Sequence, residues 1–261
     1  MKLNPNTYTD AGEGETIVFL HGFCESKELW TDFVKPLQNQ FRIVTLDLPG
    51  FGQNTETQPD DYSMEAMAEY VHKVIKQLQI KKPLVVGHSL GGYVALALAE
   101  AHPRLMSGMC LFHSSAKADT KEKKENRNKS IDFIKKHGVQ LFMQSFVGPL
   151  FYPGNKKKCS GAIEKLTLIG AATPKETVIG VMKAMRDREK RTKVLKEAKY
   201  PILFILGKDD PAVPLEAALE QVHLPTNSMT YFLAETGHMG MFERTYETRK
   251  SLQKFAETIF G

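Results

Sequence analysis

Residues 84–92 read LVVGHSLGG, a short apolar run that leads into a glycine-x-serine-x-glycine pentapeptide. The apolar run is typical of a buried strand and the residues after Ser89 are typical of a helix, so the serine stands at a strand-to-helix turn. Such a turn strains the backbone and requires neighbours without bulk, which Gly87 and Gly91 supply. The unpaired amides at the start of the helix would face the space above the Ser89 hydroxyl. The stretch therefore predicts a nucleophile elbow, built for attack on a carbonyl group.

The pentapeptide also occurs in ordinary turns, so its meaning depends on the partners that a serine nucleophile needs. These partners are a base that takes the hydroxyl proton and a carboxylate that orients the base. An acidic pair, Asp209 and Asp210, follows an apolar run in the second half of the chain, and His238 follows the next such run. Because the carboxyl ends of parallel strands meet at one edge of a sheet, we expect an aspartate and His238 to lie near Ser89.

An oxyanion that forms at this serine needs two backbone amides, of which Leu90 would supply one. The run IVFLHGF at residues 17–23 offers the second, because Gly22 lets the backbone turn so that the Phe23 amide faces the site. Loss of one such donor typically lowers the rate about 10²–10³-fold. We therefore expect the oxyanion hole to consist of the N–H groups of Phe23 and Leu90.

Short apolar runs alternate with longer patterns of helical period, which predicts a parallel sheet covered by helices on both faces. The expected strands lie at residues 17–20, 41–48, 84–86, 106–112, 202–206 and 229–233. Ser63 is expected to cap an amphipathic helix that extends to Leu78. Residues 90–101 are apolar almost all round, as expected for a buried helix behind the serine turn.

Between residues 114 and 199 the strand signal disappears and helical patterns remain. Asp119 is expected to open one helix in a capping-box pattern, and Thr173 to cap another with Pro174 at its first position. An all-helical insertion of this size between two strands of one sheet predicts a lid over the strand ends. The expected domains are an α/β core at residues 1–113 and 200–261 and a helical cap at residues 114–199.

The chain has 261 residues, of which 42% are hydrophobic. A chain of this length and composition can bury one large core. Its three cysteines lack zinc-type spacing, so we expect neither a disulfide framework nor a metal site, and a reducing compartment. Residues 1–6 lack the apolar core of a signal peptide, and no stretch approaches the roughly 20 apolar residues of a spanning helix. We therefore expect a cytoplasmic protein without membrane association, of undetermined oligomeric state.

The net charge of +5 is unevenly distributed. Residues 114–199 hold 21 Lys and Arg against 9 Asp and Glu, a surplus of twelve positive charges, and the remainder of the chain is acidic. One explanation is a solvated, lysine-rich helical face. The other is a collar that attracts an anionic or carrier-linked substrate, with Lys156–Lys158 as its least diluted cluster. Nucleic acid is not an expected partner, because no basic motif is interleaved with aromatic residues.

The chain resembles the α/β-hydrolase superfamily over nearly its whole length. The resemblance rests on five blocks in the family's order, FLHGF at 19–23, DLPGFG at 47–52, GHSLGG at 87–92, GKDDPAVP at 207–214 and GH at 237–238. It implies the α/β-hydrolase fold, a mostly parallel sheet of seven or eight strands with helices on both faces and an all-helical cap. The short amino terminus departs from the family's full first hairpin and favours seven strands.

The resemblance also implies a serine hydrolase of the carboxylesterase type that needs neither cofactor nor metal. In the family pattern the acid stands two residues before an x-Val-Pro ending, which selects Asp210 over Asp209. The implied catalytic residues are Ser89, Asp210 and His238. The pocket candidates are His88, His113, Met239, Phe142 and Phe146. The expected substrate is a small-molecule ester with a medium-sized, largely hydrophobic group.

Two alternatives stay open. A cofactor-free haloperoxidase or perhydrolase, or another small-molecule hydrolase, would use the same three side chains. Carbon–carbon bond hydrolases often place tryptophan after the histidine, where this chain has Met239. A ligand-binding signalling protein with residual hydrolysis is an alternative from a different functional class.

Overall fold

A single sheet of seven strands runs through the computed structural model, which describes residues 4–55 and 61–261. The strand order is β1-β3-β2-β4-β5-β6-β7. The strands are β1 (Tyr8–Ala11), β2 (Thr16–Leu20), β3 (Arg42–Leu46), β4 (Leu84–His88), β5 (Gly108–Phe112), β6 (Ile202–Gly207) and β7 (Ser228–Leu233). Strand β1 pairs antiparallel with β3, and every other pairing is parallel. The mostly parallel α/β sheet expected from the sequence is thereby confirmed.

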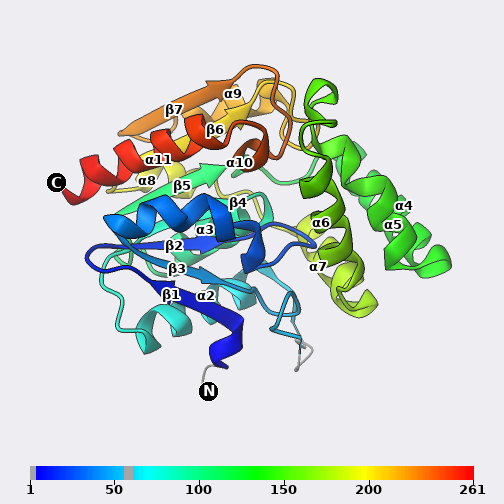
Figure 1. Cartoon of the computed structure of the whole chain (residues 1–261), viewed down its shortest axis with the longest axis horizontal. Coiled ribbons are helices and arrows are strands. Elements are labelled where there is room, and N and C mark those ends of the chain that lie inside the picture. Colours follow the sequence, from blue (N-terminus) through cyan, green and yellow to red (C-terminus); the bar gives the residue numbers. More distant parts are fainter. Residues whose placement is uncertain (1–3, 56–60) are drawn as a thin grey trace.

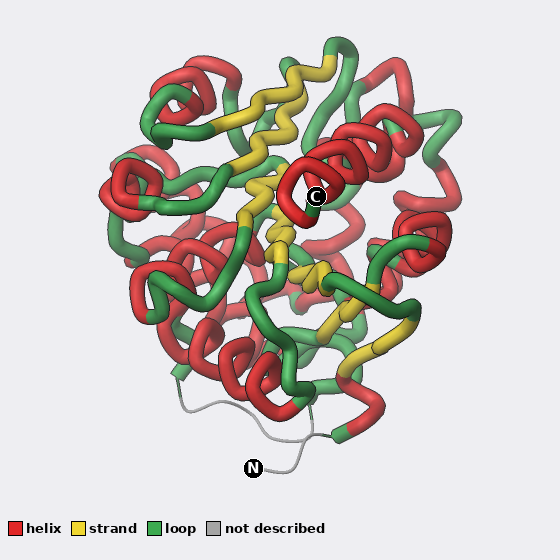
Figure 2. The backbone as a smooth tube through the Cα atoms, turned by 90° about the vertical axis from the view of Figure 1, so that its left-hand side faces the viewer, coloured by secondary structure: helices red, strands yellow, loops and turns green. Residues whose placement is uncertain are grey.

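Helices cover both faces of the sheet (Figures 1 and 2). The α-helices are α1 (Thr31–Val34), α2 (Met64–Gln77), α3 (Leu90–Ala101), α4 (Lys121–His137), α5 (Val139–Phe146), α6 (Ser160–Ala171), α7 (Lys175–Asp187), α8 (Thr192–Glu197), α9 (Leu215–Val222), α10 (Gly240–Glu243) and α11 (Thr245–Phe260). Helices α1 and α11 pack together on one face, and α2, α3 and α8 pack together on the other. Strands β2, β4, β5 and β6 are buried along their whole length, because a parallel sheet between two helical layers has no solvent face.

Local sequence signals account for the starts of the core helices. The Ser63 hydroxyl accepts a hydrogen bond from the Ala66 amide at 3.1 Å and so caps α2 as expected. Helix α3 begins directly after Ser89, and ten of its residues are buried, as its apolar composition predicts. Among the described residues, no helix combines the length and apolarity needed to span a bilayer.

Helices α4, α5, α6 and α7 lie together beyond the carboxyl ends of the strands (Figure 1). Among residues 114–199, all of which are described, there is no strand. Helix α8, from the same part of the chain, instead packs against α3. The division into two domains remains a prediction, but this placement sets α4 and α5 over the edge of the sheet where Ser89 lies.

Two helix starts differ by one residue from those expected. Thr120 rather than Asp119 caps α4, because the Asp119 carboxylate is paired with the guanidinium groups of Arg127 and Arg188. Pro174 rather than Thr173 precedes the first residue of α7. Both differences leave the helices in their expected places.

Candidate active site

The serine turn has the strained geometry that its sequence predicts. Ser89 joins β4 to α3 with φ 48° and ψ −111°, in the positive-φ region that residues other than glycine rarely adopt. Its amide donates to the Phe112 carbonyl of β5 at 3.1 Å, and the Ser114 hydroxyl donates to its carbonyl at 2.7 Å. Strand β5 and the loop that follows it therefore hold the turn at its N–H and its C=O.

Glycine is required on both sides of Ser89 because backbone atoms approach there closely. A Cβ atom added at Gly87 would lie 2.4 Å from the Gly91 carbonyl oxygen. One added at Gly91 would lie 2.5 Å from the Leu20 carbonyl oxygen, at the end of β2. The start of α3 is thereby packed directly against the loop that follows β2.

Gly91→Ala is expected to lower the free energy of unfolding by about 1–3 kcal/mol, the usual cost of forcing extra volume into a packed site. Gly161→Ala is the matched control, because a Cβ atom there meets nothing within 4 Å and α6 gains a better helix former. Urea denaturation of both variants measures the difference. Equal stability of the two variants would contradict the close packing of α3 on β2.

The loop after β2 is braced by a buried histidine, His21. Nδ1 of His21 donates to the Gly22 carbonyl at 2.7 Å, and Nε2 accepts from the Leu48 amide at 3.0 Å. Burial lowers the pKa of His21, which suits a neutral ring with one donor and one acceptor. Phe23, two residues after His21, lines the same cavity as Ser89.

Asp210 and His238, in the loops after β6 and β7, are hydrogen-bonded to each other. Nδ1 of His238 donates to Oδ2 of Asp210 at 2.8 Å, while Oδ1 accepts from the amides of Ala212 and Val213 at 2.8 and 2.9 Å. Burial alone would raise the pKa of the Asp210 carboxyl, but its histidine partners lower that pKa far below its ordinary value. Asp209 is exposed. The structure thus places Asp210, and not Asp209, against the imidazole.

His113, at the end of β5, also contacts the Asp210 carboxylate. Its Nδ1 lies 3.1 Å from Oδ2 of Asp210, and the whole side chain is buried. Burial lowers the pKa of His113 to about 4, so the ring is neutral at pH 7, and the Gly207 amide donates to the same Nδ1 at 3.2 Å. His113 therefore lies behind the acid rather than in the cavity wall where the sequence suggested it.

His88 forms a second buried pair, with Glu25. Nδ1 of His88 donates to Oε2 of Glu25 at 3.0 Å, and Nε2 donates to the His238 carbonyl at 3.1 Å. Oε2 of Glu25 also accepts from the Gly22 amide at 2.5 Å. Burial alone would lower the pKa of His88, but the Glu25 carboxylate raises it, which favours the doubly protonated ring that these two bonds need. This pair joins the loop after β2 to the loop that carries His238.

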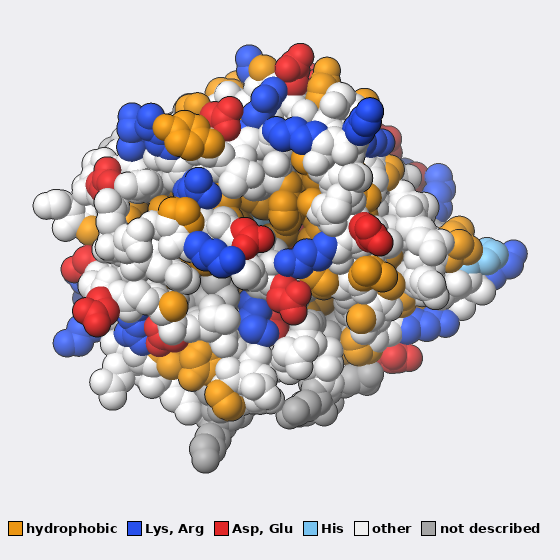
Figure 3. Space-filling model, in the orientation of Figure 1, with side chains coloured by type: hydrophobic (Ala, Val, Ile, Leu, Met, Phe, Trp, Pro, Cys, Tyr) orange, Lys and Arg blue, Asp and Glu red, His pale blue; other side chains and the backbone are white. Residues whose placement is uncertain are grey.

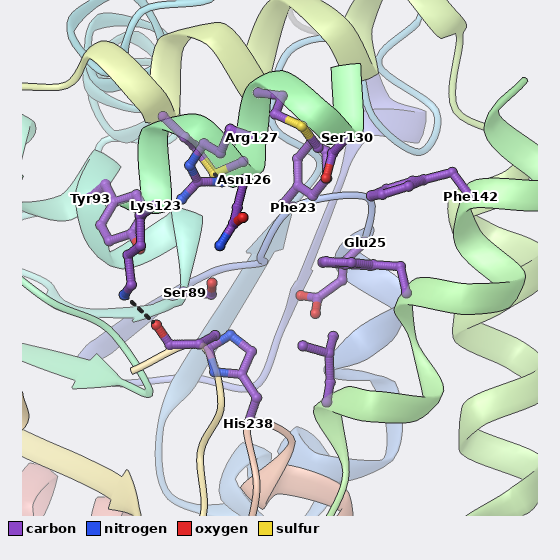
Figure 4. Close-up of a pocket in the computed structure, with 15 residues that line it drawn as sticks. Phe23, Glu25, Ser89, Tyr93, Lys123, Asn126, Arg127, Ser130, Phe142 and His238 are labelled. Atoms are coloured by element: carbon purple, nitrogen blue, oxygen red, sulfur yellow. Dashed lines mark hydrogen bonds between the residues drawn. The ribbon is translucent and has the colours of Figure 1, made fainter. Parts of the chain in front are cut away.

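A cavity of about 220 Å³ opens above Ser89 (Figure 4). Its walls consist of Phe23, Glu25, Ser89, Tyr93, Lys123, Asn126, Arg127, Ser130, Phe142, Phe146, Leu150, Met182, Met185, Ala212 and His238. Because Nδ1 of His238 is taken by Asp210, the opposite ring nitrogen, Nε2, is left for this cavity.

The pocket residues expected from the sequence divide into two groups. Phe142 and Phe146 are in the cavity wall, whereas His88, His113 and Met239 are fully buried outside it. His88 and His113 are displaced from the wall because each holds a buried carboxylate, as described above.

Sequence reasoning missed Glu25 and the polar residues of α4 that line the cavity. Glu25 stands three residues after Gly22, and no general spacing rule marks such a position. The basic cluster Lys156–Lys158, which the sequence singled out, is exposed and does not line the cavity. On the face in Figure 3, lysines and arginines are mixed with acidic side chains, as on a solvated surface.

Two groups among the described residues bring three possible metal ligands within 4.8 Å of one another. One consists of His113, Asp210 and His238, whose ligand atoms already hydrogen-bond to each other. The other, Glu69, His72 and His102, lies on α2 and at the end of α3, outside the cavity wall. The chemistry available at the cavity is that of a hydroxyl, an imidazole and a carboxylate.

Comparison with known proteins agrees with this fold. Residues 15–132 match the family model described as alpha/beta hydrolase fold. A putative carbamate hydrolase of Agrobacterium fabrum is 30% identical over 217 residues, which cover 81% of this chain and 80% of the relative. An uncharacterized hydrolase of Bacillus subtilis is 28% identical over 252 residues, covering 88% of this chain and 85% of the relative. A solved thermophilic esterase from Thermogutta terrifontis superposes with a TM-score of 0.90 at 25% identity, over 97% of this chain and 93% of that one. The chain therefore belongs to the alpha/beta hydrolase family, and it is a hydrolase of that fold.

Proposed function

We propose that the protein is a serine hydrolase that cleaves carboxylic esters through an acyl-enzyme. Ser89 is the nucleophile, His238 the general base and acid, and Asp210 the carboxylate that orients His238. One observation carries the proposal: a histidine held by a buried aspartate through Nδ1 shares a cavity with a serine on a strained strand-to-helix turn. This is the arrangement that nucleophilic catalysis by a serine requires.

In the first half of the reaction, Oγ of Ser89 attacks the ester carbonyl carbon while Nε2 of His238 takes the hydroxyl proton. The carbonyl oxygen becomes an oxyanion, which the N–H groups of Phe23 and Leu90 stabilise. The bond between the carbonyl carbon and the alcohol oxygen then breaks, and His238 gives its proton to the leaving alcohol. Asp210 remains ionised and stabilises the imidazolium.

In the second half, water attacks the acyl carbon of the ester on Ser89, and His238 takes a proton from that water. The oxyanion forms again in the same hole. Collapse of this intermediate breaks the bond to Oγ, His238 returns the proton to Ser89, and the carboxylic acid leaves. No redox step occurs, so the reaction consumes only the ester and one water molecule.

The cavity supports a substrate of modest size with an apolar group. Aromatic rings form much of one wall, with Phe142 and Phe146 stacked at a centroid distance of 5.0 Å and Phe23 edge-on to Phe146 at 6.0 Å. The esterase and the putative carbamate hydrolase among the similar proteins fit a substrate whose carbonyl carbon carries a heteroatom.

A panel of p-nitrophenyl esters tests the proposal, with acyl groups from acetate through butyrate, hexanoate and decanoate to palmitate. We expect kcat above about one per second, the low end of ordinary enzymes. The cavity volume predicts the highest kcat/KM for butyrate or hexanoate and little turnover of palmitate. Release of p-nitrophenol no faster than in buffer for every ester would contradict the proposed function.

A further inference from the structure

One face of α4 presents polar side chains to the cavity. Lys123, Asn126, Arg127 and Ser130 follow one another at helical spacing, and all four line the cavity together with Ser89. A helix face that covers a core is ordinarily apolar. Here it carries an ammonium, an amide, a guanidinium and a hydroxyl, all of which can donate hydrogen bonds.

Among residues 4–55 and 61–261, the Lys123 ammonium makes one hydrogen bond. Its Nζ donates to the Ala212 carbonyl at 2.8 Å, in the loop that carries Asp210 (Figure 4). An ammonium has three N–H donors, so this bond leaves two of them for another acceptor. Lys123 is thus fixed beside the cavity, and no carboxylate in the described part of the chain pairs with it.

Arg127 has a carboxylate partner that it must share. Asp119 pairs with Arg127 and also with Arg188, so two guanidinium groups face one carboxylate. Within the ranges 4–55 and 61–261, Nη1 of Arg127 donates only to the Met185 sulfur, at 3.7 Å, and a thioether is a weak acceptor. A donor of this cation is therefore poorly satisfied beside the cavity.

The acidic residue in the cavity wall does not offset these charges. Glu25 is paired with His88, whose pKa it raises, and it also accepts from the Gly22 amide. Glu25 therefore does not neutralise the two cations. Figure 4 shows Lys123 and Tyr93 on one side of Ser89, and Phe23, Phe142 and Ser130 on the other.

We propose that Lys123, Asn126 and Arg127 form a subsite for a carboxylate of the substrate. This inference rests on the proposed function and deepens it: the ester that Ser89 attacks carries a second, free carboxylate, and its apolar part lies against the aromatic wall. Hydrogen bonds from cations to a carboxylate are about twice as strong as hydrogen bonds between neutral groups.

Two matched pairs of esters test the subsite. Mono-p-nitrophenyl glutarate and its methyl-capped diester differ in a free carboxylate on the acyl side. Acetoxybenzoate and its methyl ester differ in a free carboxylate on the alcohol side. Spontaneous hydrolysis is subtracted with Ser89→Ala. In at least one pair, we expect wild-type kcat/KM to be higher for the free carboxylate than for its capped partner.

The ratio of interest is kcat/KM for the free-carboxylate ester divided by kcat/KM for its capped partner. Lys123→Gln and Arg127→Gln are each expected to lower this ratio roughly ten- to a hundredfold, the effect of losing a hydrogen bond to a charged group. Lys123→Arg keeps the charge and should retain most of the ratio. Lys129→Gln is the matched control, because Lys129 is on the same helix, carries the same charge and is exposed outside the cavity wall. It should leave the ratio unchanged. Thermal melts check that each variant is folded.

Equal kcat/KM for free and capped esters in both pairs would overturn the subsite, and so would an equal fall of the ratio in Lys129→Gln. Ser89-dependent hydrolysis of the capped esters would in that case leave the proposed function standing.

If no ester is hydrolysed, the proposed function fails, and ligand binding still tests the subsite. We expect glutarate to raise the melting temperature of Ser89→Ala, and Lys123→Gln to abolish the rise. No rise with glutarate, or a rise with inorganic phosphate alone, would contradict a carboxylate subsite.

Discussion

Ser89→Ala is expected to lower kcat for the best ester of the panel by about 10⁶-fold, the loss typical of removing a serine nucleophile. Without Oγ no acyl-enzyme can form, and the imidazole and the oxyanion amides have no attacking group to assist. The methyl group that remains is smaller than the hydroxymethyl it replaces, so the turn should keep its geometry. Stopped-flow or steady-state release of p-nitrophenol measures the loss.

Ser107→Ala is the control for this variant. The Ser107 hydroxyl is buried and has no hydrogen-bond partner among residues 4–55 and 61–261, so its removal should change neither folding nor kcat. Activity of Ser89→Ala above about one hundredth of wild type would place the nucleophile elsewhere, since removal of a serine nucleophile ordinarily costs far more. A circular dichroism spectrum like that of the wild type excludes unfolding as the cause of the loss.

Asp210→Asn is expected to lower kcat about 10⁴-fold, because an amide in place of the carboxylate favours the wrong tautomer of the histidine. The Asn side chain would turn an N–H toward Nδ1 of His238, which moves the ring proton to Nε2. Nε2 could then no longer accept the proton of Ser89. Release of p-nitrophenol by this variant, corrected for spontaneous hydrolysis of the ester in buffer, gives the size of the loss in kcat.

Asp209→Asn makes the identical chemical change one residue earlier, on an exposed side chain, and should leave kcat within about threefold of wild type, as surface substitutions away from a site do. A larger loss in Asp209→Asn than in Asp210→Asn would overturn the assignment of the acid.

The lowered pKa of Asp210 also has a consequence for stability. A carboxyl whose pKa is depressed by folding stabilises the protein above its unfolded pKa, about 3.9, and this contribution is lost as the pH falls further. The difference in unfolding free energy between wild type and Asp210→Asn should therefore shrink as the pH is lowered through 4.

The sequence predicted the large features of this fold because they depend on apolar runs and on turns with few solutions. Six strands were expected from such runs, and all six are present. Strand β1 was missed, because its four residues, YTDA, are half-exposed and have no apolar alternation. It forms through pairing with β3 at the edge of the sheet, a contact between distant parts of the chain.

The same distinction holds for the site. Ser89, Asp210 and His238 stand in motifs that are visible in the local sequence, so the sequence could predict them as a group, and the structure brings Asp210 and His238 into contact. The pairing of Glu25 with His88 and the sharing of Asp210 by His113 depend on contacts across 63 and 97 residues. The polar face of α4 has a visible helical spacing, but only the packing of α4 against α5 and α7 determines that it faces the cavity.

Covalent labelling is the most direct test of a serine nucleophile at position 89. A fluorophosphonate reacts with an activated serine hydroxyl, so the wild-type chain should gain one phosphonyl group, and peptide mass spectrometry should locate it on Ser89. His238→Ala should react far more slowly, and Ser89→Ala should not be labelled. A phosphonyl group on any other residue, or equal labelling of wild type and His238→Ala, would contradict the proposed triad.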